Sequence, residues 1–168
     1  MAPDFYYYAG GKRIPLELDR EHVAVDVGVV ESREGRRPDP AAVEGAEELR
    51  SGLYLVEKSS LSADIRRRLD QEDALLPVFL YEDALVVVLP EVRVEIAAGA
   101  ETEVHRFLEQ SDVPNQILTD EGTRLVVRPD SGRGEDALRL ANDLQESVPV
   151  EMAQARFLRR VPKRGRAT

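Results

Sequence analysis

The stretch that decides the fold is VRVEIAAGAETEVHRFL, residues 92–108, where a two-residue periodicity gives way to a helical one. Val92, Val94 and Ile96 alternate with charged residues, a pattern typical of a strand with one buried face. In residues 101–111 the apolar side chains recur at helical spacing, and glutamates occupy the rest of the turn. The stretch therefore predicts a strand followed by an amphipathic helix.

The residues that follow predict a hairpin, a second helix and a last strand. Apolar runs in 116–119 and 124–128 flank Asp-Glu-Gly, which favours a tight turn. A helical pattern begins with acidic residues at Glu135 and ends at Pro149, and residues 150–153 follow as a strand. The C-terminal half is therefore expected to be α+β with the ferredoxin-like order βαββαβ, an antiparallel sheet with two helices on one face.

The N-terminal half predicts a related or accessory α+β unit. A hairpin is expected in residues 5–18, because Gly10 and Gly11 permit the positive φ of a tight turn. Alternating valines predict a strand in residues 22–29. The other expected elements are a helix in 41–50, a strand in 53–56, a helix in 62–72 with Ser62 as its N-cap, and a hairpin of 76–81 with 85–89.

The chain is expected to divide into three parts. These are an N-terminal α+β region of residues 1–90, a βαββαβ unit of residues 91–155 and a basic C-terminal tail of residues 156–168. Similar strand sequences, such as VAVDVG and VRVEI, leave open whether the first region is a divergent copy of the second. The tail carries six basic residues, and the other 17 basic and 32 acidic residues of the chain give −15. An acidic body opposes binding to a phosphate backbone, so nucleic acid is not an expected partner.

Length and composition limit the class of protein. The 168 residues suit one ordinary domain or two small ones. No segment approaches the roughly 18 apolar residues of a membrane span, and the N-terminus lacks the pattern of a signal peptide. The absence of cysteine excludes disulfides and thiolate metal sites. The cytoplasm is the default expectation, with secretion expected if the chain is excised from a longer precursor.

Three segments carry a resemblance to a known family: YYYAGGKRIPL at 6–16, LPVF at 76–79 with VRVEI at 92–96, and ALRLANDLQESVPVEMAQARFL at 137–158. They resemble the N-terminal prodomains of bacterial subtilisin-like serine proteases. Three positions depart from that pattern, because Met152 replaces an aromatic residue and Gln154-Ala155 replaces Glu-Pro. These departures are compatible with a free-standing relative that binds without being cut from a protease.

The resemblance implies a non-catalytic module that acts as intramolecular chaperone and/or inhibitor of a subtilisin-like protease, in cis or in trans. Its sheet would dock on the protease, and its last strand would lie in the substrate cleft by β-augmentation. The expected contact residues are Ala153, Gln154, Ala155, Arg156, Phe157 and Leu158. Two alternatives stay open: an ordinary strand at 150–154 followed by a disordered tail, and a regulatory adaptor that binds a non-protease partner in a bacterial multi-protein system.

No catalytic residue, metal or cofactor is expected. His22 and His105 lie outside protease motifs, and no serine has a nucleophile motif around it. Glu101, His105 and Glu109 share a helical face, a spacing that is more typical of solvent-facing side chains than of a metal site. GRGEDA at 132–137 fits G-x-G-x-x-A, but its acidic residues oppose a pyrophosphate. The acidic residues near His22, namely Asp19, Glu21 and Asp26, are interpreted as the charged exterior of a strand.

Overall fold

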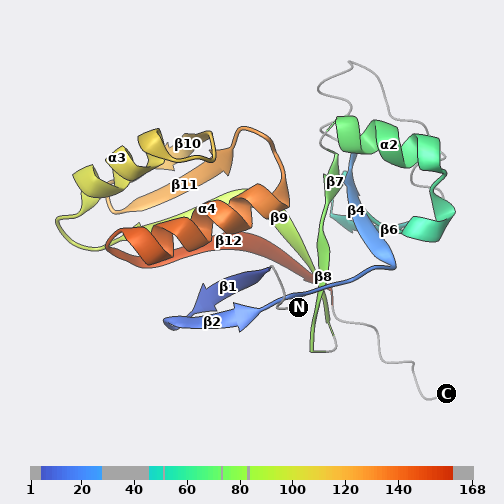
Figure 1. Cartoon of the computed structure of the whole chain (residues 1–168), viewed down its shortest axis with the longest axis horizontal. Coiled ribbons are helices and arrows are strands. Elements are labelled where there is room, and N and C mark those ends of the chain that lie inside the picture. Colours follow the sequence, from blue (N-terminus) through green and yellow to red (C-terminus); the bar gives the residue numbers. More distant parts are fainter. Residues whose placement is uncertain (1–4, 28–45, 51, 73, 83, 161–168) are drawn as a thin grey trace. The chain divides into compact units, whose positions relative to one another are not determined.

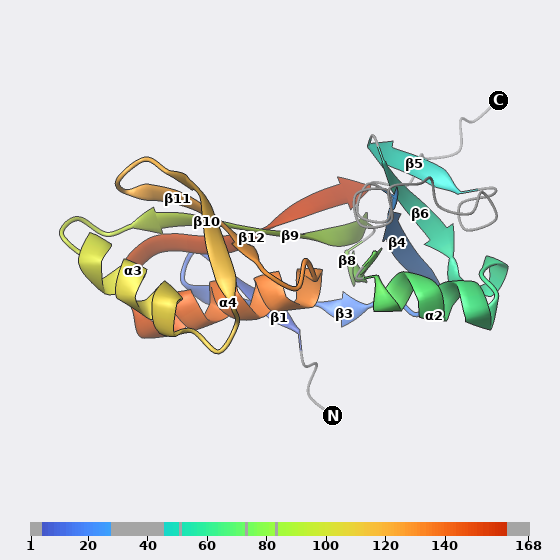
Figure 2. The same ribbon diagram turned by 90° about the horizontal axis from the view of Figure 1, so that it is seen from above.

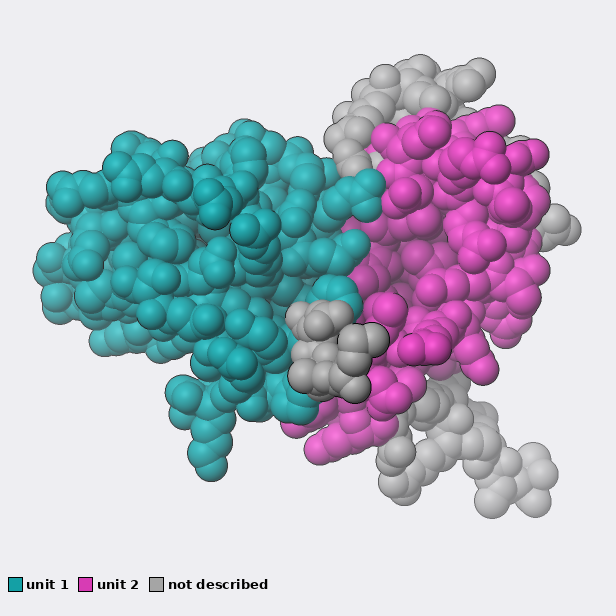
Figure 3. Space-filling model, in the orientation of Figure 1, with its two compact units in different colours: residues 1–16, 88–156 teal, residues 17–87, 157–168 magenta. Residues whose placement is uncertain are grey.

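The structure is a computed structural model that describes residues 5–27, 46–50, 52–72, 74–82 and 84–160 (Figure 1). It contains antiparallel sheets and the helices α2, α3 and α4, so the predicted α+β class is confirmed. The chain forms two compact units, coloured separately in Figure 3. Unit 1 comprises residues 1–16 and 88–156, and unit 2 comprises residues 17–87 and 157–168. None of the described helices has the length and apolar character needed to cross a membrane.

Unit 1 combines a hairpin, two helices and a sheet. Its elements are β1 (Tyr6–Ala9), β2 (Lys12–Pro15), the later part of β9 (Ala84–Ile96), α3 (Glu101–Gln110), β10 (Asn115–Asp120), β11 (Arg124–Pro129), α4 (Gly134–Ser147) and β12 (Val150–Arg160). Strand β11 pairs antiparallel with both β10 and β9, and β12 pairs with β9. The strand order in unit 1 is therefore β10-β11-β9-β12. Both predicted helices and the predicted hairpin of this half are confirmed.

The core of unit 1 lies between the inward residues of the sheet and the apolar faces of the two helices. Val92, Val94 and Ile96 of β9 are buried, which confirms the alternation that predicted this strand. The helices contribute Val104 and Leu108 from α3, and Ala137, Leu138, Leu140, Ala141 and Leu144 from α4. Burying these side chains is the main favourable contribution to the folding of the unit.

The hairpin of β1 and β2 also belongs to unit 1. Its register runs from Tyr6 opposite Pro15 to Ala9 opposite Lys12, so two residues form the turn. These are Gly10 and Gly11, with φ values of 58° and 77°, as a two-residue turn of this kind requires. The predicted glycine turn is therefore confirmed.

Unit 2 contains two small groups of strands and one helix among its described residues. Its elements are β3 (Glu17–Leu18), β4 (His22–Asp26), β5 (Glu47–Arg50), β6 (Leu53–Glu57), the 3-10 turn η2 (Lys58–Ser60), α2 (Ala63–Gln71), β7 (Leu75–Leu76), β8 (Val78–Tyr81) and the first residues of β9. The strands pair in the orders β5-β6-β4-β7 and β3-β8-β9. A core of Val23, Val25, Val56, Leu61, Leu69 and Ala74 joins β4 and β6 to α2. Ser62 caps α2 as predicted, because its Oγ accepts from the backbone N–H of Ile65 at 3.2 Å.

The structure differs from the sequence-based expectation in the segment before β6. A helix was predicted for residues 41–50, but Glu47–Arg50 form β5, which pairs antiparallel with β6. Residues 41–45 lie outside the described part of the chain. The pairing with β6 outweighs the local helical pattern, as tertiary contacts often do for short segments.

The structure also extends two strands beyond their expected limits. Strand β9 runs without interruption through Pro90, where the boundary between residues 1–90 and 91–155 was expected. Strand β12 continues to Arg160, so residues 156–160 of the expected basic tail are part of a strand. The remaining tail, residues 161–168, lies outside the described residues. The boundaries of the two compact units lie within β9 and β12, so each of these strands contributes residues to both units.

Candidate functional site

The residues predicted to contact a partner all lie on β12. Ala153 and Ala155 are only 2% and 3% exposed, whereas Met152 and Gln154 are half-buried. Side chains therefore alternate along this part of the strand as expected, with the alanines facing the interior. Phe157 and Leu158 are also half-buried. In this state the alanines can offer a partner only their main-chain groups.

Arginines of β12 are held by glutamates that are distant in the sequence. In unit 1, the Nη1 atom of Arg156 donates to Oε2 of Glu91 at 2.7 Å. In unit 2, the guanidinium of Arg160 donates to both carboxylate oxygens of Glu47, at 2.7 and 3.1 Å. Paired hydrogen bonds of this kind fix the direction of a side chain as well as its charge. Both arginines therefore stabilise the strand.

Helix α4 contacts the backbone of β12 through one side chain. The Oε1 atom of Gln145 accepts from the backbone N–H of Ala153 at 3.0 Å. This N–H is thus paired with a side chain of α4. Because an N–H that faces the neighbouring strand bonds to one of its carbonyls, we infer that the N–H of Ala153 points to the outer edge of β12. Gln145 covers this edge where a further strand could add.

A cavity lies between the N-terminal segment and α4, within unit 1. Its volume is about 280 Å³. The lining residues are Phe5, Tyr6, Glu135, Asp136, Leu138, Arg139, Asn142 and Asp143. Asn142 closes one side, because its Nδ2 donates to the backbone oxygen of Tyr6 at 2.8 Å. One wall therefore comes from the start of the chain and the other from its last helix.

The charged residues that line this cavity are predominantly acidic, namely Glu135, Asp136 and Asp143 beside Arg139. Arg139 lies 3.8 Å from a carboxylate oxygen of Asp112 and 4.0 Å from one of Asp143. Burial raises the pKa of Asp143, and the nearby guanidinium of Arg139 opposes that rise. A partly desolvated carboxylate gains more from a cation than a fully hydrated one does.

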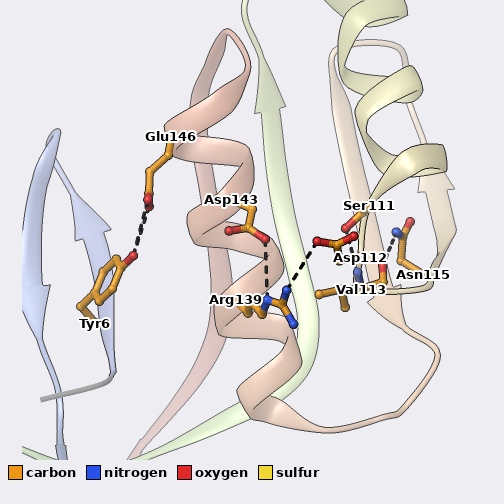
Figure 4. A network of polar contacts seen from close by, with 8 residues as sticks. All are labelled: Tyr6, Ser111, Asp112, Val113, Asn115, Arg139, Asp143 and Glu146. Atoms are coloured by element: carbon orange, nitrogen blue, oxygen red, sulfur yellow. Dashed lines mark hydrogen bonds and ion pairs between the residues drawn. The ribbon is translucent and has the colours of Figure 1, made fainter.

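Tyr6 connects the hairpin to the exposed side of α4. Its hydroxyl donates to Oε2 of Glu146 at 3.1 Å, the contact drawn in Figure 4. The guanidinium of Arg13 lies over the ring of Tyr6, with its carbon 4.1 Å from the ring centre. Burial raises the pKa of Tyr6, and the hydrogen bond to Glu146 raises it further. The ring of Tyr6 therefore accepts a cation on its face while its hydroxyl holds the helix.

His105 uses both of its ring nitrogens within unit 1. Its Nδ1 lies 2.7 Å from the backbone oxygen of Glu101, and its Nε2 lies 3.1 Å from Oδ2 of Asp120. The hydrogen bond to the Glu101 carbonyl, followed by that to Asp120, raises the pKa of His105. The imidazole is thus directed at Asp120 and a backbone carbonyl, and the three-residue face of Glu101, His105 and Glu109 does not form a shared site.

One group in unit 2 has the spacing of metal ligands. Possible ligand atoms of Asp19, Glu21 and His22 lie within 4.8 Å of one another. Asp19 is 6% exposed, so interpreting it as a charged exterior residue was wrong. Its Oδ1 accepts from the backbone N–H of Glu21 at 3.0 Å, and its Oδ2 lies 2.7 Å from Nδ1 of His22. Both carboxylate oxygens of Asp19 therefore contact residues two and three positions further along the chain.

The G-x-G-x-x-A segment forms the turn into α4. Its preceding strand, β11, pairs antiparallel with both neighbours, whereas the dinucleotide motif belongs to a parallel βαβ unit. Oγ of Ser131 accepts from the N–H of Arg133 at 3.1 Å and donates to Oδ2 of Asp136 at 2.6 Å. The side chains of Ser131 and Asp136 therefore occupy the N-terminal end of α4.

No protein-family model, curated protein or solved structure matches the chain. Sequence reasoning did not predict the contacts of Tyr6, Asn142 and Gln145, each of which bonds to the backbone or side chain of another element. Asn142 offered one signal, because it is a polar residue on the apolar face of the predicted helix. Such residues are usually hydrogen-bonded when buried.

Proposed function

We propose that the chain is a non-catalytic protease-binding module resembling the prodomain of a subtilisin-like protease, acting as chaperone and/or inhibitor. The strand order β12-β9-β11-β10 in unit 1 supports the proposal. Helices connect β9 to β10 and β11 to β12, and both lie along one side of β9 and β12 in Figure 2. This order supports the ferredoxin-like βαββαβ arrangement that the resemblance implies.

Binding would use β12, which has a single paired neighbour among the described strands of unit 1. A partner strand beside β12 would receive main-chain hydrogen bonds, and exposed side chains would supply specificity. Gln154, Phe157 and Leu158 retain exposed surface for this purpose, whereas the alanines are buried. Since Gln145 occupies the edge at Ala153, its side chain must move when a partner pairs there.

The test is inhibition of a purified subtilisin by the intact chain. Nanomolar inhibition is expected, with loss of at least about tenfold, or 1.4 kcal/mol, in Leu158→Asp. Leu118→Asp is the matched control, because Leu118 is 47% exposed on the opposite edge strand β10. Circular dichroism must show that both variants fold. Absence of inhibition by the intact chain, or equal loss in both variants, contradicts the proposal.

A regulatory adaptor that binds a non-protease partner is the second candidate. It is favoured by the anchoring of β12, because Arg156 and Arg160 are both held by glutamates. A strand fixed in this way is less available for insertion into a cleft than a free segment is. Glu91→Gln distinguishes the candidates, because it removes the charge that holds Arg156 of β12. If β12 enters a protease cleft, the variant should inhibit the protease more strongly than the original chain. If the chain is an adaptor, the variant should gain no affinity for the protease.

A further inference from the structure

The sheet of unit 1 has two faces, and one of them packs on the helices. Val92 and Val94 of β9 are buried on that face, opposite Val127 and Leu125 of β11. Successive side chains of a strand point to opposite faces of a sheet. The residues between these apolar positions therefore point away from the helices.

The face that points away from the helices is rich in arginine, and we call it the arginine face. Its charged residues are Glu91, Arg93 and Glu95 of β9, Arg124 and Arg128 of β11, and Arg156 of β12. Arg93 and Arg124 are exposed, and Arg128 is half-buried beside Gly132. Val126, which is also half-buried, lies directly opposite Arg93. The face therefore places guanidinium groups around an apolar side chain.

Charge is distributed unevenly between the arginine face and the rest of unit 1. The sequence of the unit contains nine Lys and Arg residues against 15 Asp and Glu residues. Four of the basic residues and two of the acidic residues lie on the arginine face. The face is thus net positive, whereas the remainder of the unit, with five basic and 13 acidic residues, is strongly negative. A partner that docks on this face is therefore expected to be negatively charged.

Most of the positive charge on this face is not used within the protein. Apart from Arg156, the arginines of the face form no ion pair with any residue that the structure describes. Glu95 lies opposite Arg124 in the register, and Glu121 donates its backbone N–H to the carbonyl oxygen of Arg124 at 2.9 Å. Within the described ranges, neither carboxylate forms an ion pair with Arg124. Guanidinium groups bind carboxylates through paired hydrogen bonds, so these arginines are available to the carboxylates of a partner.

The spacing of the arginines determines which kind of partner fits. Arg124 and Val126 are two residues apart on one strand, a distance of about 6.6 Å. Arg93 is on the neighbouring strand, about 5 Å from Val126. Carboxylates on either side of an apolar side chain would match these positions. A short acidic protein segment with an apolar residue among its acidic residues therefore fits the face.

Nucleic acid fits this face less well than an acidic protein segment does. Sheets that bind single-stranded RNA stack its bases on aromatic side chains, and β9, β10 and β11 contain no aromatic residue. A long polyanion would also extend over the acidic remainder of the unit. The Debye length is about 8 Å at physiological salt, so a short segment confined to the face is largely screened from those distant charges.

We propose that the arginine face of unit 1 binds an acidic protein segment in which acidic residues surround an apolar one. Arg93 and Arg124 contact its carboxylates, and Val126 contacts its apolar side chain. Arg128 adds positive charge at the edge of the same face. The binding surface is the face of the sheet and not the edge of β12, so it does not depend on inhibition of a protease.

The experiment is an NMR titration of the full chain with the blocked peptide Asp-Glu-Asp-Leu-Asp-Glu-Asp. The matched compound is the neutral peptide Asn-Gln-Asn-Leu-Asn-Gln-Asn. Saturable shifts are expected at the amides of β9 and β11 with the acidic peptide alone, and added salt should weaken the binding. Arg93→Gln should weaken it about threefold, which is typical of an exposed ion pair. Glu95→Gln should tighten it, because a repelling charge is lost.

Arg106→Gln is the matched control. Arg106 is exposed on α3, so this change removes the same charge from the helix side of unit 1. Binding of the acidic peptide should be unchanged, and circular dichroism must show that all variants fold. Equal losses in Arg93→Gln and Arg106→Gln would show attraction to net charge alone and would overturn the proposal.

Two further outcomes would also overturn it. One is equal binding of the neutral peptide, or shifts confined to residues outside β9 and β11. The other is tighter binding of an oligothymidylate that carries as many negative charges as the acidic peptide. That result would identify the arginine face as a surface for nucleic acid and not for protein.

Discussion

His105 is the residue whose protonation should affect folding most visibly. Its two nitrogens face acceptors, the Glu101 carbonyl and the Asp120 carboxylate, so the charged imidazolium satisfies both contacts. The pKa of His105 is raised by these contacts. The pKa of Asp120 is lowered from 3.8, first by the backbone N–H of Gly122 and then by His105. The pair thus connects α3 to β10 most strongly when both groups are charged.

The direction of each pKa shift sets the pH range in which this contact stabilises the fold. For His105 the contribution is fully present below its unfolded pKa of about 6.5 and is lost as pH rises through its higher folded value. For Asp120 it is present above the unfolded pKa of 3.8 and is lost as pH falls through its lower folded value. We expect the largest contribution between about pH 4 and 6.5.

Asp120→Asn tests this pair. The pKa of His105 should fall toward its ordinary value but remain above it, because the larger cause, the hydrogen bond to the Glu101 carbonyl, is retained. NMR titration of the imidazole protons measures the change. Asp64→Asn, an exposed change on α2 with the same loss of charge, is the control and should leave the pKa of His105 unchanged. An unchanged pKa of His105 would mean that the contact with Asp120 does not persist in solution.

At the scale of elements, Gln145 protects the edge of β12. Gln145→Ala should lower the free energy of unfolding by about 1 kcal/mol, because the N–H of Ala153 loses its partner. The exposed strand edge should also promote self-association. Urea denaturation and size-exclusion chromatography measure the two effects. Ser147→Ala, an exposed change in the last turn of α4, is the control. Equal stability and monomer content in both variants would disprove a protective role.

Elements with strong local patterns were predictable from the sequence. Alternation in Val92–Ile96, helical spacing after residue 101 and the cap at Ser62 all depend on neighbouring residues, and the structure confirms them. Strand β5 and the extension of β12 were not predictable in this way. Their pairing depends on β6 and on glutamates such as Glu47, which lies 113 residues from its partner Arg160.

The candidate functional residues show the same difference between what the sequence predicts and what depends on distant contacts. The contact residues expected at 153–158 were chosen from the resemblance, and these residues lie on β12. The cavity could not be predicted, because Tyr6 and Asn142 are 136 residues apart in the sequence. Nothing local to either residue indicates the other. The hairpin and α4 must first be brought together by the fold.

At the scale of the whole molecule, each unit has an apolar core of its own. The core of unit 2 includes Leu69 of α2, which is 3% exposed. The core of unit 1 includes Leu140 of α4, which is fully buried. Strands β9 and β12 contribute residues to both units, so the chain could unfold either in two steps or as one cooperative body.

Leu69→Ala should distinguish these possibilities. Loss of a buried leucine costs about 2–5 kcal/mol, and we expect the loss to fall on unit 2. Hydrogen exchange followed by mass spectrometry should show faster exchange in β4, β6 and α2, with protection retained in α3 and α4. Leu140→Ala is the reciprocal variant and should give the opposite pattern. If each substitution accelerates exchange equally in both units, the shared strands couple them into a single cooperative domain, and the expectation of independent cores is wrong.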